Sequence, residues 1–260
     1  MPQIREIHLD ISNPDRSIEF YVDRLGMRLV SETAGSYSLA CQSGAQLKLR
    51  HRTNASGYHE RDSDAYWKIG ITIADVDVAR ERLNGHNIDV TESRQFFDIG
   101  YLCHLEDPDG YWIELLQHRF ESNHKPASPI ESEPLGNVPV IGQVSLNVSS
   151  IDQSLAFYSG QLGFKLISRQ RVPGRGFTLY FLGDAKLQPP SADVDALENR
   201  EWLWQLPKTV LELRAFEIQA QKVIPHPPES ELGFRGIGIE SPTLNSVTQD
   251  PDGVCILRQL

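Results

Sequence analysis

Residues 7–30, "IHLDISNPDRSIEFYVDRLGMRLV", align without a gap to residues 144–167, "VSLNVSSIDQSLAFYSGQLGFKLI". Each copy opens with alternating apolar residues, a pattern that indicates a half-buried strand. A short helix is expected next, because apolar residues follow at helical spacing and Asn13 or Asp15 can cap its first turn. Gly26 is suited to end this helix, and a further strand follows it. The repeat predicts that the chain holds two related units of mixed α and β structure.

The second part of each copy also recurs. Residues 66–90 read as strand, helix and strand, and Asp75 is placed to cap the helix. A further strand, a turn and a last strand are expected over 101–117. Residues 4–118 therefore read as two strand–helix–strand–strand–strand units in series.

A turn motif shows where the two copies differ. "HLEDPDGYWIELLQHRF" (104–120) and "QDPDGVCILRQL" (249–260) share an Asp-Pro-Asp-Gly turn followed by an apolar strand. The first strand carries Glu114 at a position where the second carries Leu257. A carboxylate within an apolar strand is costly unless it has a partner, so Glu114 is the first candidate for a functional residue.

Composition shifts divide the chain into two modules. We predict a first module over 1–120, a linker rich in Pro, Ser and Glu over 121–139, and a second module over 140–260. In the second module "FRGIGIE" (234–240) lies much closer to the DPDG turn than "WKIGITI" (67–73) does in the first. The second module is therefore expected to lack one helix and the strand after it. We expect a fragment ending near residue 120 to remain at least partly folded.

The length, the net charge and the cysteine content of the chain exclude several classes of protein. The chain has 260 residues and a net charge of −10, and it lacks a basic patch, so no nucleic-acid partner is expected. No apolar run is long enough for a membrane span, and the start lacks the pattern of a signal peptide. Three distant cysteines predict buried free thiols in a reducing compartment. We expect a cytoplasmic protein, a monomer or homodimer, that binds a small molecule.

Several of these stretches resemble one known family. "SLAFYSGQLGFKLISRQ", "FTLYFLGD", "TVLEL", "GFRGIGI" and "EDPDGYWIELL" are similar to glyoxalase I and its relatives, the vicinal oxygen chelate superfamily. The resemblance implies an α+β fold in which paired βαβββ units curl an eight-stranded mixed sheet into a cup. Two such modules stand in tandem here, the second truncated. Members include lyases, isomerases, ring-cleaving dioxygenases and metal-free drug-binding proteins, so the site must decide the activity.

The resemblance also implies four inward-facing positions that bind a divalent metal, which would polarise two substrate oxygens. The first module offers His8, Lys48, Lys68 and Glu114 there, and the second offers Ser145, Glu212, Gly236 and Leu257. If the halves pair within modules, the first cup combines the former set. If the halves are exchanged between modules, one cup combines Ser145, Glu212, Lys68 and Glu114. Neither arrangement supplies three ligands, because an ammonium group repels a cation.

The candidate residues follow from these positions. Glu114, His8 and His104 are the candidate catalytic residues; a rearranged metal centre would use His8 and Glu114, and His104 could join them across the turn. The candidate ligand-binding residues are Lys48, Lys68, Trp112 and Glu212. An ion pair of Glu114 with Lys68 or Lys48, left from a lost metal site, is the structural alternative.

These observations leave three functions open. The first is a glyoxalase-like enzyme of lyase, isomerase or ring-cleaving dioxygenase type, with a divergent or lost metal site. The second is a metal-free ligand-binding protein of the bleomycin-resistance type, and the third is a scaffold without catalysis. The cofactor is correspondingly one divalent metal ion or none.

Overall fold

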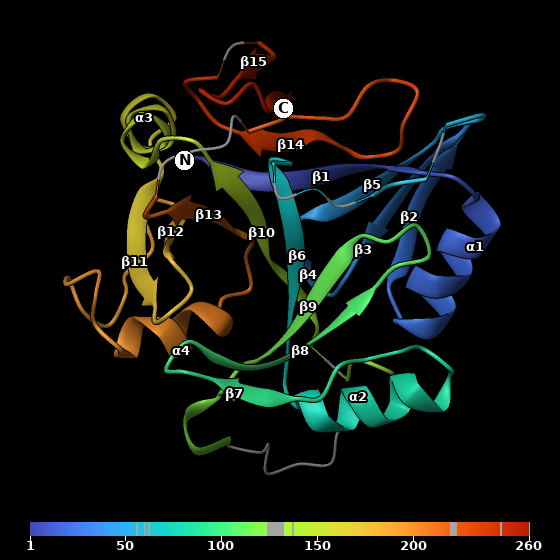
Figure 1. Cartoon of the computed structure of the whole chain (residues 1–260), viewed down its shortest axis with the longest axis horizontal. Helices are drawn as coiled ribbons and strands as arrows, with labels where there is room; N and C mark the ends of the chain where they lie inside the picture. Colours follow the sequence, from blue (N-terminus) through green and yellow to red (C-terminus); the bar gives the residue numbers. More distant parts are fainter. Residues whose placement is uncertain are drawn as a thin grey trace.

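Two curved sheets form the protein, and each takes strands from both repeats (Figure 1). The computed structural model describes residues 1–55, 57–59, 61, 63–123, 133–136, 138–218, 223–244 and 246–259. Most of the expected linker, 124–132 and 137, lies outside the described residues. The boundaries of the two modules remain a prediction.

The first sheet, which we call sheet A, has the order β15-β16-β14-β1-β5-β3-β2. Its strands are β1 (Gln3–Ile11), β2 (Arg28–Thr33), β3 (Ser36–Ala40), β5 (Gln46–His51), β14 (Phe234–Glu240), β15 (Thr248–Gln249) and β16 (Cys255–Gln259).

The second sheet, sheet B, has the order β11-β12-β13-β10-β6-β9-β8-β7, with β4 paired to β10. Its strands are β4 (Ser43–Gly44), β6 (Tyr66–Ile73), β7 (Arg94–Phe96), β8 (Gly100–Glu106), β9 (Trp112–Gln117), β10 (Val140–Val148), β11 (Lys165–Val172), β12 (Phe177–Gly183) and β13 (Val210–Phe216).

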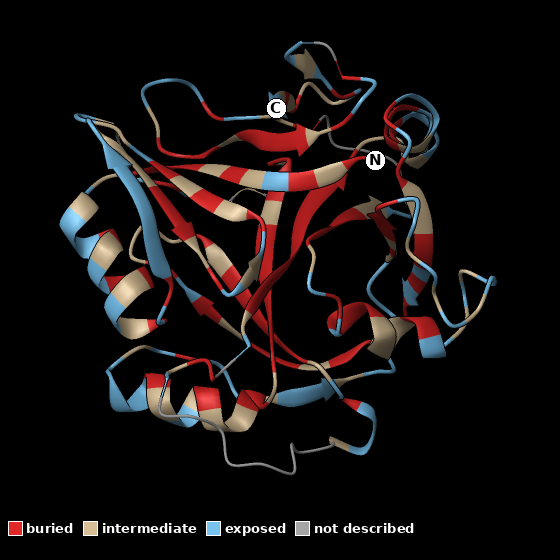
Figure 2. Cartoon of the chain, turned by 180° about the vertical axis from the view of Figure 1, so that it is seen from behind, coloured by how far each residue is buried: buried red, intermediate tan, exposed pale blue. Residues whose placement is uncertain are grey.

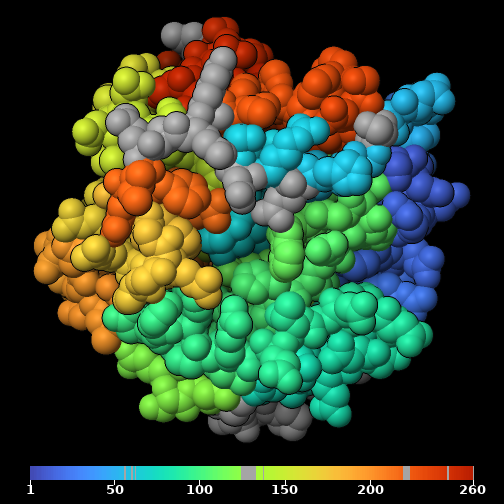
Figure 3. All heavy atoms as spheres, in the orientation of Figure 1, coloured from blue at the N-terminus to red at the C-terminus, as the bar shows by residue number. Residues whose placement is uncertain are grey.

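The halves of the repeats are exchanged between the sheets. Strand β1 pairs antiparallel with β14 from the other end of the chain, and β10 pairs antiparallel with β6. Figure 3 accordingly shows yellow and orange segments of the second repeat directly against green segments of the first. Of the two pairings left open by the sequence, the exchange between modules is the one observed. The strands of residues 1–120 are therefore divided between the two sheets.

The α+β cup fold is confirmed, with one difference in strand number. Among the described residues, sheet A has seven strands and sheet B has nine. Sheet A has no counterpart of β7, as the shortened second repeat predicts. Sheet B has the expected eight strands plus the two-residue β4.

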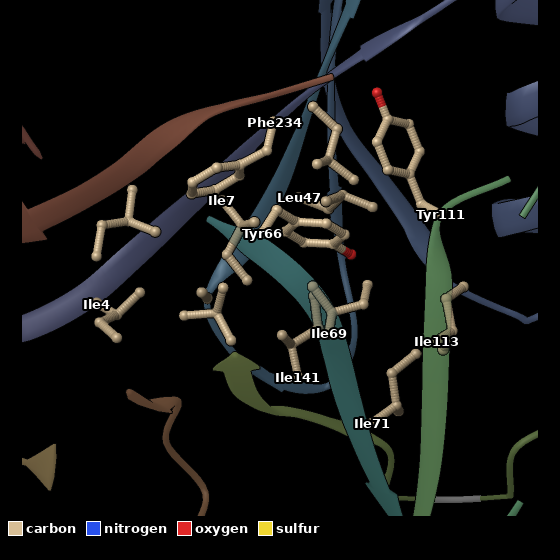
Figure 4. Close-up of a cluster of buried hydrophobic side chains, with 14 of the residues drawn as sticks. Ile4, Ile7, Leu47, Tyr66, Ile69, Ile71, Tyr111, Ile113, Ile141 and Phe234 are labelled. Carbon is tan, nitrogen blue, oxygen red and sulfur yellow. The ribbon is translucent and has the colours of Figure 1, made fainter. Parts of the chain in front are cut away.

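The backs of the two sheets pack on each other where their central strands cross. In Figure 4, Ile7 and Phe234 of sheet A face Tyr66 and Ile69 of sheet B, within one continuous cluster of buried side chains. Burying one such side chain completely stabilises the fold by about 1.5–3 kcal/mol. Strand β10 is buried over all nine of its residues, and Figure 2 shows the crossing strands in red. The cups therefore open away from each other.

The helices connect strands and cover sheet edges. They are α1 (Pro14–Ile18) with the π-helix η1 (Glu19–Arg24), α2 (Val76–Gly85), the 3₁₀ helix η2 (Glu121–Asn123), α3 (Ile151–Leu155) with the π-helix η3 (Ala156–Gln161), and α4 (Glu198–Trp204). Within the described ranges, no helix combines the length and apolar character needed to cross a bilayer.

The predicted capping residues are found in place. The Asn13 side chain accepts a hydrogen bond from the Arg16 backbone, and Asp75 accepts two at the start of α2. Gly26 ends the first helix at a positive φ of 74°, a conformation that glycine adopts without strain. Between α1 and this glycine the helix widens to π-type hydrogen bonding, which the apolar spacing did not predict.

The DPDG turns tie the helices to the sheets. In the first turn, the buried Asp107 carboxylate accepts hydrogen bonds from the backbone of Asp109 and Tyr111, each at 2.9 Å. It also accepts one from the Tyr21 hydroxyl at 2.8 Å. Asp250 makes the same contacts in the second turn, with Tyr158 as the hydroxyl donor. The turn is therefore a structural motif in both repeats.

Candidate functional site

The concave face of sheet B encloses a cavity of about 250 Å³. Its lining comes from both repeats, because the halves are exchanged between the sheets. The lining residues are Trp67, Lys68, Arg94, Phe96, Ile99, Leu102, His104, Glu114, Leu116, Gln143, Arg175, Phe177, Leu179, Phe181, Trp204, Glu212 and Arg214.

A segment without a counterpart in the first repeat closes one side of this cavity. Strands β12 and β13 are separated by residues 184–209, which include α4, whereas β3 and β5 are separated only by 41–45. The buried Trp204 of α4 donates a hydrogen bond from Nε1 to the Ile99 carbonyl at 2.8 Å. Figure 1 shows α4 beside β7 at the edge of sheet B. The longer spacing between "FTLYFLGD" and "TVLEL" was the sequence signal for this cover, and the sequence analysis did not use it.

Glu114 lies on the floor of the cavity and is held by three donors. It is 4% exposed. Its Oε1 accepts hydrogen bonds from Lys68 Nζ at 2.6 Å and from His104 Nε2 at 2.9 Å. Its Oε2 accepts one from Gln143 Nε2 at 2.9 Å. Burial alone would raise the pKa of Glu114, but Lys68 and His104 outweigh this effect and lower the pKa below its ordinary value. The Glu114 side chain is therefore an ionised carboxylate that holds Lys68, His104 and Gln143 in place.

Gly70 makes the contact between Glu114 and Gln143 possible. It lies on β6 with Gln143 opposite on one neighbouring strand and Glu114 opposite on the other. A Cβ atom at Gly70 would lie 2.4 Å from Gln143 Cγ, well inside contact distance. The missing side chain lets Gln143 reach across β6 to the carboxylate.

A β-bulge turns two successive residues of β6 toward the cavity. Between Ser145 and Leu146 the pairing with β6 shifts by one residue, which leaves Trp67 unpaired beside Lys68. Both side chains line the cavity, although neighbours on a regular strand point to opposite faces. Lys68 Nζ lies 4.0 Å from the centroid of the Trp67 ring, a cation–π contact.

Glu212 is a second buried carboxylate in the cavity, and it behaves oppositely to Glu114. It accepts a hydrogen bond from the Ser145 hydroxyl. Burial raises the pKa of Glu212, and the negative charge of Glu114 raises it further, while Lys68 and Ser145 act in the lowering direction. One cavity therefore holds two carboxylates whose pKa values are shifted apart, an arrangement suited to acid–base chemistry.

Three arginines also line the cavity and add positive charge to it. The Arg214 guanidinium lies 3.9 Å from the Trp67 ring centroid, and its Nε donates to Asn147 Oδ1 at 2.6 Å. Arg94 and Arg175 are exposed at the rim. Within the described part of the chain, neither rim arginine has an ion-pair or side-chain hydrogen-bond partner. Arg94, Arg175 and Gln143 were not predicted from the sequence, because none of them lies at a motif position.

The remaining candidate residues lie elsewhere. His8 and Lys48 are neighbours on β1 and β5 of sheet A. They bind Glu6, His8 through Nε2 at 3.0 Å and Lys48 through Nζ at 3.1 Å. The structure therefore does not bring His8 together with Glu114, because the two residues belong to different sheets. His104 does meet Glu114, as described above.

Trp112 flanks the site without lining the cavity. Its ring meets the His104 ring edge-on, with centroids 5.7 Å apart. It lies instead on a separate surface hollow, which His104 shares.

The four positions that correspond to the superfamily's metal ligands are Ser145, Glu212, Lys68 and Glu114. They do not fit a divalent cation, because the Lys68 ammonium occupies the place of one ligand and already pairs with another. Within the ranges described above, no group of three or more His, Cys, Asp or Glu side chains is arranged to hold a metal ion. These four side chains instead form two contacts, the Lys68–Glu114 ion pair and the hydrogen bond from Ser145 to Glu212.

Comparison with known proteins identifies the family. A family model described as "Glyoxalase/Bleomycin resistance protein/Dioxygenase superfamily" matches residues 3–115 and 140–196. Glyoxalase I of Saccharomyces cerevisiae is 24% identical over 209 residues, which cover 67% of this chain and 61% of the yeast protein. A lactoylglutathione lyase of Haemophilus influenzae is 30% identical over 128 residues, covering 45% of this chain and 93% of that enzyme. A catechol-2,3-dioxygenase of Bacillus subtilis is 24% identical over 61% of this chain and 64% of its own.

Solved structures give the same answer for the fold. A glyoxalase I variant from Zea mays superposes with a TM-score of 0.69 at 18% identity, over 99% of this chain and 92% of that one. A putative dioxygenase from Bacillus subtilis reaches 0.63 at 14% identity, over 98% and 84% of the two chains. The chain spans less than two thirds of the length of several curated relatives, among them the yeast and Bacillus enzymes. The repeat, the exchanged cups and the matched family model together show that the chain belongs to the glyoxalase/bleomycin resistance protein/dioxygenase superfamily.

Proposed function

We propose that this protein is an enzyme that transfers a proton within a small oxygenated metabolite, using the cavity of sheet B and no metal at the glyoxalase positions. The observation that carries the proposal is the Lys68 ammonium, fixed at 2.6 Å from Glu114 where the superfamily pattern has a metal ligand. A fixed positive charge in a partly closed cavity can stabilise an oxyanion as it forms. This is the task that a metal ion performs in metal-dependent relatives.

Glu212 is the proposed proton-transferring group. As a carboxylate it removes a proton from the carbon next to a substrate carbonyl, and the electron pair moves to the carbonyl oxygen. Where that carbon carries a hydroxyl group, Lys68 stabilises the resulting enediolate. The Glu212 carboxylic acid then protonates the former carbonyl carbon while the hydroxyl proton moves to the other oxygen, so that the carbonyl and the hydroxyl exchange places. Its raised pKa makes the Glu212 carboxylate a stronger base than an exposed glutamate would be.

Glu114 acts here as a positioning residue. It holds the ammonium of Lys68 and the imidazole of His104 and remains charged throughout. His104 lies in the cavity within reach of a substrate, so it is a second candidate for proton transfer.

A metal-free binding protein is the second candidate function. The partly exposed rings of Phe96, Phe177 and Trp67 favour it, and so do the two rim arginines, which have no side-chain partner among the described residues, since these groups could hold a ligand without chemistry.

Solvent exchange separates the two functions. The purified protein is incubated in D₂O with a panel of small α-keto and α-hydroxy carbonyl compounds, and deuterium incorporation next to the carbonyl is followed by NMR. We expect at least one compound to exchange, unaffected by EDTA, and Glu212→Gln to abolish the exchange. Compounds that bind by calorimetry without exchanging would support the binding protein. Exchange that requires an added divalent metal would contradict the proposal.

A further inference from the structure

We infer that the cavity of sheet B selects a small organic anion, a carboxylate with a planar apolar body, and discriminates against neutral and glutathione-linked compounds. This inference rests on the proposed use of the cavity as the substrate site, and it names the class of ligand.

The charge of the cavity is opposite to that of the protein. The chain carries a net charge of −10, yet the cavity is lined by four cationic side chains and two carboxylates. Lys68 is neutralised by Glu114, and Arg214 acts on the charge of Glu212. The two rim arginines remain without a compensating carboxylate among the described residues. Two guanidinium groups at the opening attract an anionic ligand to it.

The two rim arginines come from different halves of the sheet. Arg94 lies on β7, and Arg175 lies in the turn between β11 and β12. Both line the same cavity, so an anion at its mouth meets a guanidinium from each repeat. A guanidinium presents paired N–H donors that match the geometry of a carboxylate.

The wall and the volume of the cavity define the rest of the ligand. Phe96, Phe177 and Trp67 are only partly buried and line the same cavity as the rim arginines and the charged floor. Aromatic rings favour contact with planar apolar groups. A volume of about 250 Å³ suits a metabolite of one ring and does not suit a tripeptide conjugate.

The test is a binding measurement on the whole protein, with benzoylformate and its neutral methyl ester as probes. Calorimetry measures the binding affinity. Quenching of tryptophan fluorescence reports binding in the cavity itself, because Trp67 and Trp204 line it. We expect benzoylformate to bind at least about tenfold more tightly than the ester, with an affinity that falls as salt is added. S-substituted glutathione is expected to compete weakly or not at all.

Variants of the two rim arginines test whether these side chains cause the preference for the acid over the ester. Arg94→Gln and Arg175→Gln are each expected to weaken benzoylformate by about tenfold and to leave the ester unchanged. Arg171→Gln is the matched control, since Arg171 is exposed on neighbouring β11, pairs with Glu217 and does not line the cavity.

Each result decides the inference. Equal binding of acid and ester, no binding of the acid, or no effect of either rim variant would overturn it. Because no turnover is measured, failure of the proton-transfer proposal leaves this result unaffected. Conversely, proton exchange of neutral ketones without selective anion binding would retain the proposed function and remove the inference.

Discussion

Glu114 illustrates how one residue changes a whole site. The two DPDG strands are close copies, but only the first keeps a carboxylate, and that carboxylate is buried against Lys68, His104 and Gln143. In sheet A the corresponding position is Leu257, beside Gly238, and no cation lies opposite it on β14. Glu114 and Lys68 are therefore best understood as one unit, present in one cup and absent from the other.

Removing the charge of Glu114 should destabilise the protein. Glu114→Gln leaves the buried Lys68 ammonium without its closest partner, and breaking a buried pair costs about 3–5 kcal/mol. We expect a loss near the lower end, about 3 kcal/mol, because Glu212 also acts on Lys68. Urea unfolding followed by circular dichroism measures the loss. The double variant Glu114→Gln, Lys68→Met should recover most of the stability, and a double variant as unstable as the single one would refute the pair as the cause.

The same ammonium should also exclude a metal. In Ser145→His with Lys68→His, two imidazoles would stand beside the carboxylates of Glu212 and Glu114, a ligand set suited to divalent transition metals. We expect this variant to bind Zn²⁺ or Ni²⁺ in calorimetry, whereas the unaltered protein binds neither at these positions and shows no lactoylglutathione lyase activity. Tight metal binding by the unaltered protein that Lys68→Met leaves unchanged would contradict this assignment.

Stability should depend on pH through Glu212 in a defined direction. The pKa of Glu212 in the folded state is raised above its ordinary value of 4.5 because the side chain is buried. The folded protein then binds this proton more tightly than the unfolded chain does, so the contribution of Glu212 to stability increases as the pH falls through its folded-state pKa. Glu114 contributes with the opposite sign, since its pKa is lowered.

The variant Glu212→Gln isolates this effect. We expect its stability advantage over the unaltered protein to be largest at high pH, such as pH 8, because ionisation of the buried Glu212 destabilises the unaltered fold. The advantage should shrink or reverse at pH 5.5. Urea unfolding at the two pH values provides the comparison, and a stability difference that is independent of pH would rule out a raised pKa.

At the scale of single elements, β6 organises the site. Its bulge directs Trp67 and Lys68 into the cavity, and Gly70 leaves room for Gln143 to reach Glu114. Sheet A uses the same arrangement on β14. There Gly238 leaves room for Gln259, which donates a hydrogen bond to Glu6 at 2.6 Å. The glycine is thus a requirement for polar contacts across the middle strand.

Filling the space at Gly70 should disrupt the site. In Gly70→Ala the new Cβ would overlap Gln143, and overpacking of this kind costs about 1–3 kcal/mol. We expect this loss in urea unfolding, together with weakened binding of benzoylformate. Gly160→Ala is the control, because no atom lies within 4 Å of a Cβ at that position in η3. Equal behaviour of the two variants would show that the Gln143 contact is unimportant.

The sequence predicted only those site residues that lie at motif positions. Glu114, Lys68 and Glu212 lie at positions of a recognised motif, so they could be named in advance. Gln143 and the rim arginines enter the cavity through long-range strand pairing and through a turn, which no local spacing encodes. His8 occupies a motif position as well, but the exchange of halves places it in the other cup.

At the scale of the whole molecule, the repeat predicted the βαβββ units, their caps and the missing strand of sheet A. The partner of each unit could not be predicted. Strands β1 and β10 carry similar apolar patterns, and either one could pair with β6 or β14 as far as periodicity is concerned. The choice depends on packing between distant segments, such as the contact of Phe234 with Tyr66, whose ring centroids are 5.3 Å apart.

The exchange makes the two repeats depend on each other for folding. Fragments 1–120 and 138–260 should each be largely unfolded alone, because each holds half of both sheets. When mixed or co-expressed they should assemble and recover the circular dichroism of the whole chain. Cooperative thermal unfolding of the first fragment by itself would contradict this expectation.

The uneven second repeat has one further consequence. Its shortened stretch, after β14, belongs to sheet A, while its lengthened stretch, residues 184–209 with α4, belongs to sheet B. A single repeat can therefore simplify one cup and elaborate the other without conflict between the two changes. The connectivity thus lets the length of each stretch change in one sheet while the other sheet keeps its own connections.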